Sequence, residues 1–186
     1  MSTSASPLEA ARAWLAQDPD EDTRAELAPL IDAALGHRSW RDVAAYVPVQ
    51  IIGCLAGAIL ANLMFGLPAV SISTTDRFSW PHLLAEVVAT AGLVLVIFAL
   101  ARTGRGSVIP WAVGAYIGAA YFFTSSASFA NPAITIGRTI SDTFAGIAPA
   151  SAPGYIAAQL VGGALGLLLV RGFFGRSAQA AGHDQQ

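Results

Sequence analysis

The residues that most clearly suggest chemistry are Asn131, Pro132 and Ala133, which follow a run of small polar residues. Proline suits the first turn of a helix, because its missing N–H costs nothing there. The apolar segment that follows, about 133–140, is too short to cross a bilayer. A helix that begins at membrane depth points its positive N-terminal end at a water-filled cavity. The Asn131 amide can then donate to a passing water or alcohol oxygen, while the helix dipole repels cations, including hydronium.

On a soluble surface the same triplet would be an ordinary helix cap, so its meaning depends on the elements around it. The chain is 54% apolar and 12% charged, whereas soluble domains carry about 25% charge. Four uncharged or nearly uncharged stretches are long enough to span a bilayer and lack the polar faces of soluble core helices. They lie at 44–67, 82–101, 108–126 and 155–174. We therefore predict an all-α integral membrane protein with about four transmembrane helices and one re-entrant half-helix.

Several classes of function are excluded. Cys54 is the single cysteine and the three histidines are scattered, so we expect no disulfide, no metal site and no cofactor. No nucleophile–base pair and no phosphate-cradling loop is present, so we do not expect an enzyme. The net charge of −2, without a basic stripe, gives no case for nucleic acid.

The arginines predict an orientation. Four spans place six arginines on one side of the membrane and two on the other, and cytoplasmic loops are the arginine-rich ones. The six are Arg38, Arg41, Arg102, Arg105, Arg171 and Arg176, against Arg77 and Arg138. We expect a multi-pass protein of the cell membrane with both termini in the cytoplasm.

The chain divides into three parts. Residues 1–36 are acidic and contain a capping-box helix start at 6–9, so they predict an acidic, helical cytoplasmic head. Residues 37–175 form the transmembrane domain, and 176–186 a polar C-terminal tail. Segment 11–31 resembles the opening of bacterial phosphohexomutases, but no loop of that family follows, so no catalytic role is carried over.

The pattern Tyr-x3-Gln-x2-Gly-x3-Gly occurs twice in apolar segments, displaced by 109 residues. The copies are Tyr46, Gln50, Gly53 and Gly57, and then Tyr155, Gln159, Gly162 and Gly166. Glycine pairs arise by chance in spanning helices, but tyrosine and glutamine in the same register indicate duplication. Glycines let helices approach closely, so we expect both copies to be packing faces. Their spans cross in opposite directions, as in inverted-repeat channels.

Together these segments resemble the major intrinsic protein family of aquaporins and glycerol facilitators. SFANPAIT looks like the second signature loop of that family. AYVPVQIIGCLAGAIL, LLAEVVATAGLVLVIFALA and PGYIAAQLVGGALGLLL look like its third, fourth and sixth helices. The resemblance implies an aquaporin-like fold that is a passive channel for water, glycerol or similar small uncharged solutes.

The resemblance also implies roles for single residues. Glu86 matches a buried acid that accepts hydrogen bonds from loop N–H groups; a proton relay or an interfacial acid are the alternatives. Most water-selective members carry arginine where this chain has Ile134. The other filter positions fall on Ser128 and Ala119, both small. We therefore expect a wider and less cationic filter, as in glycerol-type members or in bacterial ones linked with neutral metalloid acids.

Part of the family pattern is not found in this sequence. The first of two expected triplets would fall near 25–27, inside the acidic head, so we expect a partial fold that lacks the first two spans. One half-helix leaves a pore wall absent, and a channel would then need self-association into a homo-oligomer, or a partner. The alternatives are a non-conducting truncated membrane protein and a membrane-tethered interaction module. The lipid bilayer and small neutral solutes are the other partners expected.

Overall fold

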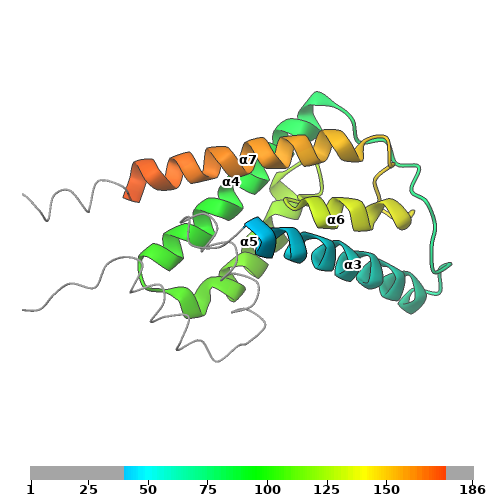
Figure 1. Ribbon diagram of the computed structural model, residues 1–186. Helices are drawn as coiled ribbons and strands as arrows, with labels where there is room; N and C mark the ends of the chain where they lie inside the picture. The colour runs from blue at the N-terminus through cyan, green and yellow to red at the C-terminus, as the bar shows by residue number, and fades with distance from the viewer. Residues whose placement is uncertain (1–39, 175–186) are drawn as a thin grey trace, which may run out of the picture.

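The computed structural model describes residues 40–174, so the predicted head at 1–36 and tail at 176–186 lie outside the described residues. All regular structure in the described range is helical (Figure 1). The long helices are α3 (Trp40–Met64), α4 (Trp80–Arg102), α5 (Ile109–Phe123) and α7 (Ala152–Phe174). The short ones are α6 (Pro132–Gly137) and the 3-10 turns η1 (Gly106–Val108) and η2 (Arg138–Ile140).

Four helical segments are long and apolar enough to cross a membrane, and they coincide with the four predicted spans. They are α3, α4, α5 together with η1, and α7. None of them has a distinct polar face, which is the pattern of a helix embedded in lipid rather than in the surface of a soluble protein. The predicted fold class, a partial aquaporin-like membrane fold with one half-helix, is confirmed.

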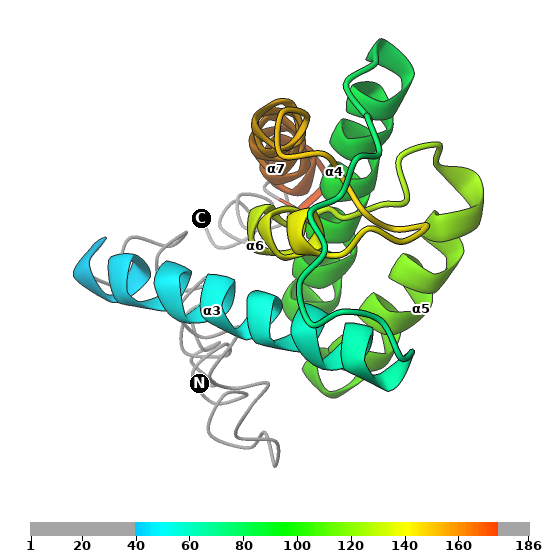
Figure 2. The same cartoon turned by 90° about the vertical axis from the view of Figure 1, so that its right-hand side faces the viewer.

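The short helix α6 lies at the centre of the bundle (Figure 2). α3 packs against α6 on one side, α7 packs against α6 and along α4, and α5 packs against α4. α4 and α7 run in the same direction, and α6 and its preceding loop fill the space beside them. α3 and α7 therefore position α6 directly, and α7 in turn packs along α4.

The second copy of the sequence repeat packs tightly against α4. A side-chain carbon at Gly162 would lie 2.6 Å from the Val87 carbonyl oxygen, and one at Gly166 would lie 2.8 Å from that of Ala91. Such distances are shorter than van der Waals contact, so only glycine allows this approach. In the described part of the chain, these two glycines are packing positions between α4 and α7.

The first copy has different surroundings. A side-chain carbon at Gly53 or Gly57 would have no described atom within 4 Å. Gln50 donates a 3.3 Å hydrogen bond to Tyr46 of its own helix, whereas its counterpart Gln159 bonds across helices. The face of α3 that corresponds to the packed face of α7 is therefore uncovered by the described residues.

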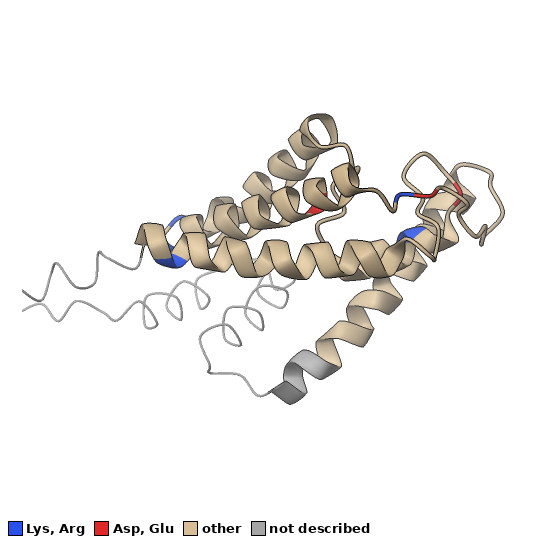
Figure 3. Ribbon diagram, turned by 90° about the horizontal axis from the view of Figure 1, so that it is seen from above, with Lys and Arg blue, Asp and Glu red and all other residues tan. Residues whose placement is uncertain are grey.

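Charged residues gather at the two ends of the bundle (Figure 3). The end at which α4 and α7 finish carries Arg102, Arg105 and Arg171. The opposite end, where the loops after α3 and α6 lie, carries Asp76, Arg77, Arg138 and Asp142. Glu86 is the one charged side chain at the depth of the spans among the described residues.

Candidate functional site

The loop that precedes α6 has an unusual backbone. Ala127, Ser128 and Ala130 all have positive φ angles, of 67°, 46° and 48°. Residues with a side chain rarely adopt this left-handed conformation, and each costs on the order of 1 kcal/mol or more. Such a backbone persists only where its surroundings hold it in place.

Glu86 of α4 provides that support. Its side chain is fully buried, and its oxygens accept hydrogen bonds of 2.9 Å from the Phe129 and Ala130 N–H groups. Gln159 of α7 donates a third, of 2.6 Å, to Oε2. Three donors satisfy a carboxylate that would otherwise be very unfavourable at membrane depth. This is the arrangement that the family resemblance implies for Glu86.

Asn131 begins α6. Its Oδ1 accepts a 2.8 Å hydrogen bond from the Ala133 N–H, which caps the helix. The Thr135 hydroxyl donates to the Asn131 carbonyl, and Gln159 donates to the Thr135 hydroxyl at 2.9 Å. Because the cap uses Oδ1, the Nδ2 amide of Asn131 is left without a hydrogen-bond partner among the described residues. This amide is therefore available as a donor.

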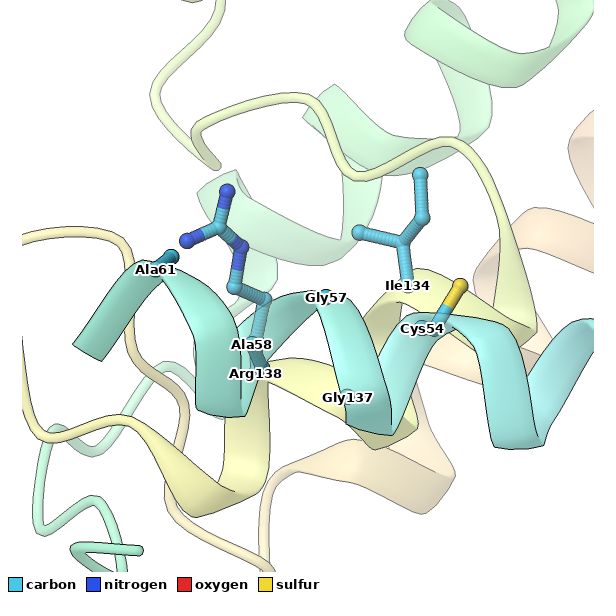
Figure 4. Close-up of a pocket in the computed structure, with 7 residues that line it drawn as sticks. All are labelled: Cys54, Gly57, Ala58, Ala61, Ile134, Gly137 and Arg138. Carbon is cyan, nitrogen blue, oxygen red and sulfur yellow. The ribbon is translucent and has the colours of Figure 1, made fainter. Parts of the chain in front are cut away.

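Two cavities flank α6. The larger, of about 320 Å³, lies on the α5 side. Its lining residues are Leu93, Val113, Ile117, Tyr121, Ser128, Phe129, Asn131, Ile134 and Arg138. The smaller, of about 220 Å³, lies on the α3 side (Figure 4). Its lining residues are Cys54, Gly57, Ala58, Ala61, Ile134, Gly137 and Arg138. Ile134 and Arg138 line both.

The structure brings three of the predicted pore residues to the larger cavity: Asn131, Ser128 and Ile134. Ala133 is buried, and Pro132 occupies the first turn of α6 and is half-buried. Ala119 is exposed and does not line either cavity. The α5 residues that do so are Val113, Ile117 and Tyr121, which share one face because they are four residues apart.

Sequence reasoning gave Arg77 no role beyond its charge. Its buried guanidinium donates to the carbonyl oxygens of Gly146 at 2.7 Å, Phe144 at 2.6 Å and Ser126 at 3.4 Å. It also lies 5.8 Å from the centre of the Phe129 ring. Arg77 thus ties the loop after α3 to the loops on both sides of α6. Its acceptors are backbone atoms, so the sequence offered no signal for these contacts beyond an arginine in the loop between α3 and α4.

Comparisons of the sequence with known proteins point to one family. The sequence profile of the family described as Major intrinsic protein matches residues 106–186. Aquaglyceroporin AqpS of Rhizobium meliloti is 46% identical over 142 residues, which are 76% of this chain and 60% of that protein. The chain thus spans about 60% of the length of this relative. No solved structure matches significantly. Members of the matched family are channels and not enzymes. On its motif, its half-helix and these similarities, the chain belongs to the major intrinsic protein family.

Proposed function

We propose that this chain forms part of a passive channel for small uncharged solutes such as glycerol. The observation that carries the proposal is the Nδ2 group of Asn131, which donates no hydrogen bond to a described residue. Asn131 lines the larger cavity at the N-terminus of α6. An amide donor and the positive end of a helix both favour an uncharged oxygen over a cation. The name of the relative, aquaglyceroporin, supports the same class of solute.

The walls of the larger cavity fit a polyol. Asn131 and Ser128 supply polar groups along the α6 side, while Leu93, Val113 and Ile117 supply an apolar surface opposite. A molecule with hydroxyl groups on one edge and C–H groups on the other can satisfy both surfaces at once. Ile134 and Ser128, rather than larger or charged residues, leave room for a solute wider than water.

We propose further that the pore is completed by a second protein surface on the α3 side. The smaller cavity is bordered by the α3 face that carries Gly57, and a side-chain carbon at Gly53 or Gly57 would have no described neighbour. Since α7 uses the same pattern to pack on α4, α3 is suited to receive a helix of similar form. Another copy of this chain or a partner polypeptide would supply it.

The uneven distribution of charged residues between the two ends of the bundle supports an orientation of the chain in the membrane. Arg102, Arg105 and Arg171 lie at the end where α4 and α7 finish, and cytoplasmic ends are enriched in arginine. We propose that this end faces the cytoplasm of the cell. The loops on both sides of α6 would then enter the membrane from the outer side.

Stopped-flow light scattering on proteoliposomes tests the proposal. Vesicles with the full chain should swell in glycerol and in a neutral metalloid acid faster than empty vesicles, with water as a third solute. The informative variant is Asn131→Asp, because aspartate keeps the oxygen that caps α6 but replaces the donor with a negative charge. We expect glycerol flux to fall about tenfold or more.

Two outcomes would contradict this proposal. Wild-type flux equal to that of empty vesicles, with the protein inserted, would show a non-conducting protein. Unchanged flux in Asn131→Asp would remove Asn131 from the pathway. The oligomeric mass in detergent, measured on the same preparation, separates completion of the pore by a second copy from completion by a partner.

A further inference from the structure

Arg138 lies four residues after Ile134, so the two side chains project from the same side of the helical segment formed by α6 and η2. Both line the larger and the smaller cavity. Figure 4 shows them pointing to one side of α6, with the Cys54 thiol on that side as well. Four residues of helix separate the two positions by about 6 Å along the axis. The guanidinium is therefore one helical turn farther from Asn131 than Ile134 is.

The charge of Arg138 is not taken up by a described partner. Its guanidinium makes no hydrogen bond and no ion pair with the described residues. The nearby acids are engaged elsewhere: Asp142 accepts from Thr74 N–H at 3.0 Å and Asp76 from the Ser151 hydroxyl at 2.7 Å. Arg77, by contrast, donates hydrogen bonds to three backbone carbonyls and lines neither cavity. Of these two arginines, only Arg138 presents its charge to the cavities.

We propose that Arg138 is the charge-selecting residue of the solute pathway. Its positive charge lies about two helical turns from the positive N-terminal end of α6, so that cations meet repulsion both at Arg138 and at Asn131. Ile134 keeps the intervening position apolar and open. Cations are thereby excluded from the pathway, while solutes with oxygen atoms can accept hydrogen bonds from the guanidinium. This inference rests on the proposed channel function for its biological meaning, but the field at the cavity can be measured without flux.

Cys54 offers the measurement. It is the single cysteine of the chain, and it lines the smaller cavity together with Arg138. In proteoliposomes of the full chain, Cys54 is modified with an anionic reagent, sulfonatoethyl methanethiosulfonate, and with a cationic one, trimethylammonioethyl methanethiosulfonate. Each rate, followed by mass spectrometry, is divided by the rate of the same reagent with a free thiol. We expect the normalised anionic rate to exceed the cationic one about tenfold. High salt should reduce this preference.

Three variants assign the preference to Arg138. Arg138→Gln should bring the normalised ratio close to one, whereas Arg138→Lys should retain most of it because the charge remains. Arg171→Gln is the matched control, since Arg171 lies in the last turn of α7 at the opposite end of the bundle. It should leave the ratio unchanged. An equal preference in wild type and Arg138→Gln would overturn the inference. A Cys54 thiol that reacts with neither reagent would also overturn it, because Arg138 would then not share an aqueous cavity with Cys54.

Solute flux on the same vesicles separates this inference from the proposed function. Arg138→Gln should raise the permeability to a small cation, methylammonium, several-fold and leave glycerol flux within about twofold. Reagent preference without any glycerol flux would contradict the proposed channel and leave the placement of the charge intact. Glycerol flux without reagent preference would overturn the role of Arg138 and leave the channel intact.

Discussion

Gln159 donates a hydrogen bond of 2.6 Å to Oε2 of Glu86, which joins α7 to α4 at the depth at which the loop before α6 turns. Both side chains are buried. The same carboxylate accepts from the Phe129 and Ala130 N–H groups. Two spans and a strained loop therefore meet at one carboxylate, and the position of Asn131 depends on it.

Replacing Glu86 with glutamine should destabilise the protein by about 2 kcal/mol, because the amide NH2 group would face backbone N–H donors in place of one carboxylate oxygen. Thermal unfolding of the purified chain in detergent measures the loss. Thr90→Val is the control one turn along α4. The Thr90 hydroxyl oxygen is buried without a described partner, so its removal should cost nothing. Equal unfolding temperatures for wild type and Glu86→Gln would contradict the supporting role of Glu86.

The two copies of the repeat predict opposite results for one substitution. Gly162→Ala places a carbon 2.6 Å from the Val87 carbonyl oxygen and should cost about 1–3 kcal/mol by overpacking. Gly53→Ala meets no described atom and should leave the monomer as stable as wild type or slightly more stable, since alanine favours helix. Unfolding temperatures decide between them. If Gly53→Ala instead lowers the oligomeric mass, the uncovered α3 face is the surface that a second chain covers; equal losses of stability would refute the asymmetry.

Arg77→Lys should be destabilising although the charge is kept. A lysine ammonium cannot reach three carbonyls in the fork geometry that the Arg77 guanidinium uses at Ser126, Phe144 and Gly146. We expect a loss of about 3 kcal/mol, measured by thermal unfolding. Arg138→Lys provides the comparison, because the Arg138 guanidinium makes no described hydrogen bond and should tolerate the change. A smaller effect at position 77 than at position 138 would be inconsistent with these contacts.

The hydrogen bonds of Asp76, in the loop after α3, predict that the stability of the protein falls at acidic pH. The Phe78 N–H and then the Ser151 hydroxyl hold the pKa of Asp76 below its ordinary value of 3.8. Because the folded pKa lies below the unfolded one, the ionised carboxylate favours folding above pH 3.8, and this contribution disappears as the pH falls through the lower folded value. The difference in unfolding temperature between wild type and Asp76→Asn should be constant near neutral pH and shrink below pH 3.8. A difference that grows on acidification would reverse the sign and contradict the shift.

The elements of the fold could be predicted because their signals are local. Four apolar stretches, each ended by charge or by a polar turn, gave the spans to within a few residues. Pro132 after Asn131 gave the start of α6, since proline and an N-cap asparagine mark a helix beginning. Glu86 stood out for the same reason, as one acid in a long apolar segment.

The parts that could not be predicted depend on backbone atoms far apart in the chain. Arg77 bonds to carbonyls 49 to 69 residues away, and a carbonyl carries no sequence signature. Ala127, Ser128 and Ala130 adopt positive φ although none of them is glycine, so the residue types do not predict this backbone conformation in the loop before α6. The α5 contribution to the cavity was expected near Ala119. It lies at Val113, Ile117 and Tyr121 because of how α5 is rotated against α4, which an evenly apolar helix does not reveal.

The hydrogen bond between Glu86 and Gln159 joins residues that are 73 positions apart. Ribosomes add about 5 to 20 residues per second, so Gln159 is synthesised roughly 4 to 15 s after Glu86. The first N–H donors for this carboxylate, at Phe129 and Ala130, also follow it by 43 and 44 residues. During biogenesis, α4 must therefore enter the bilayer with an acid that none of these three donors yet satisfies, at an energetic cost. The loop before α6 and then α7 remove that cost in turn, so the surroundings of Glu86 are complete only after Gln159 has been synthesised.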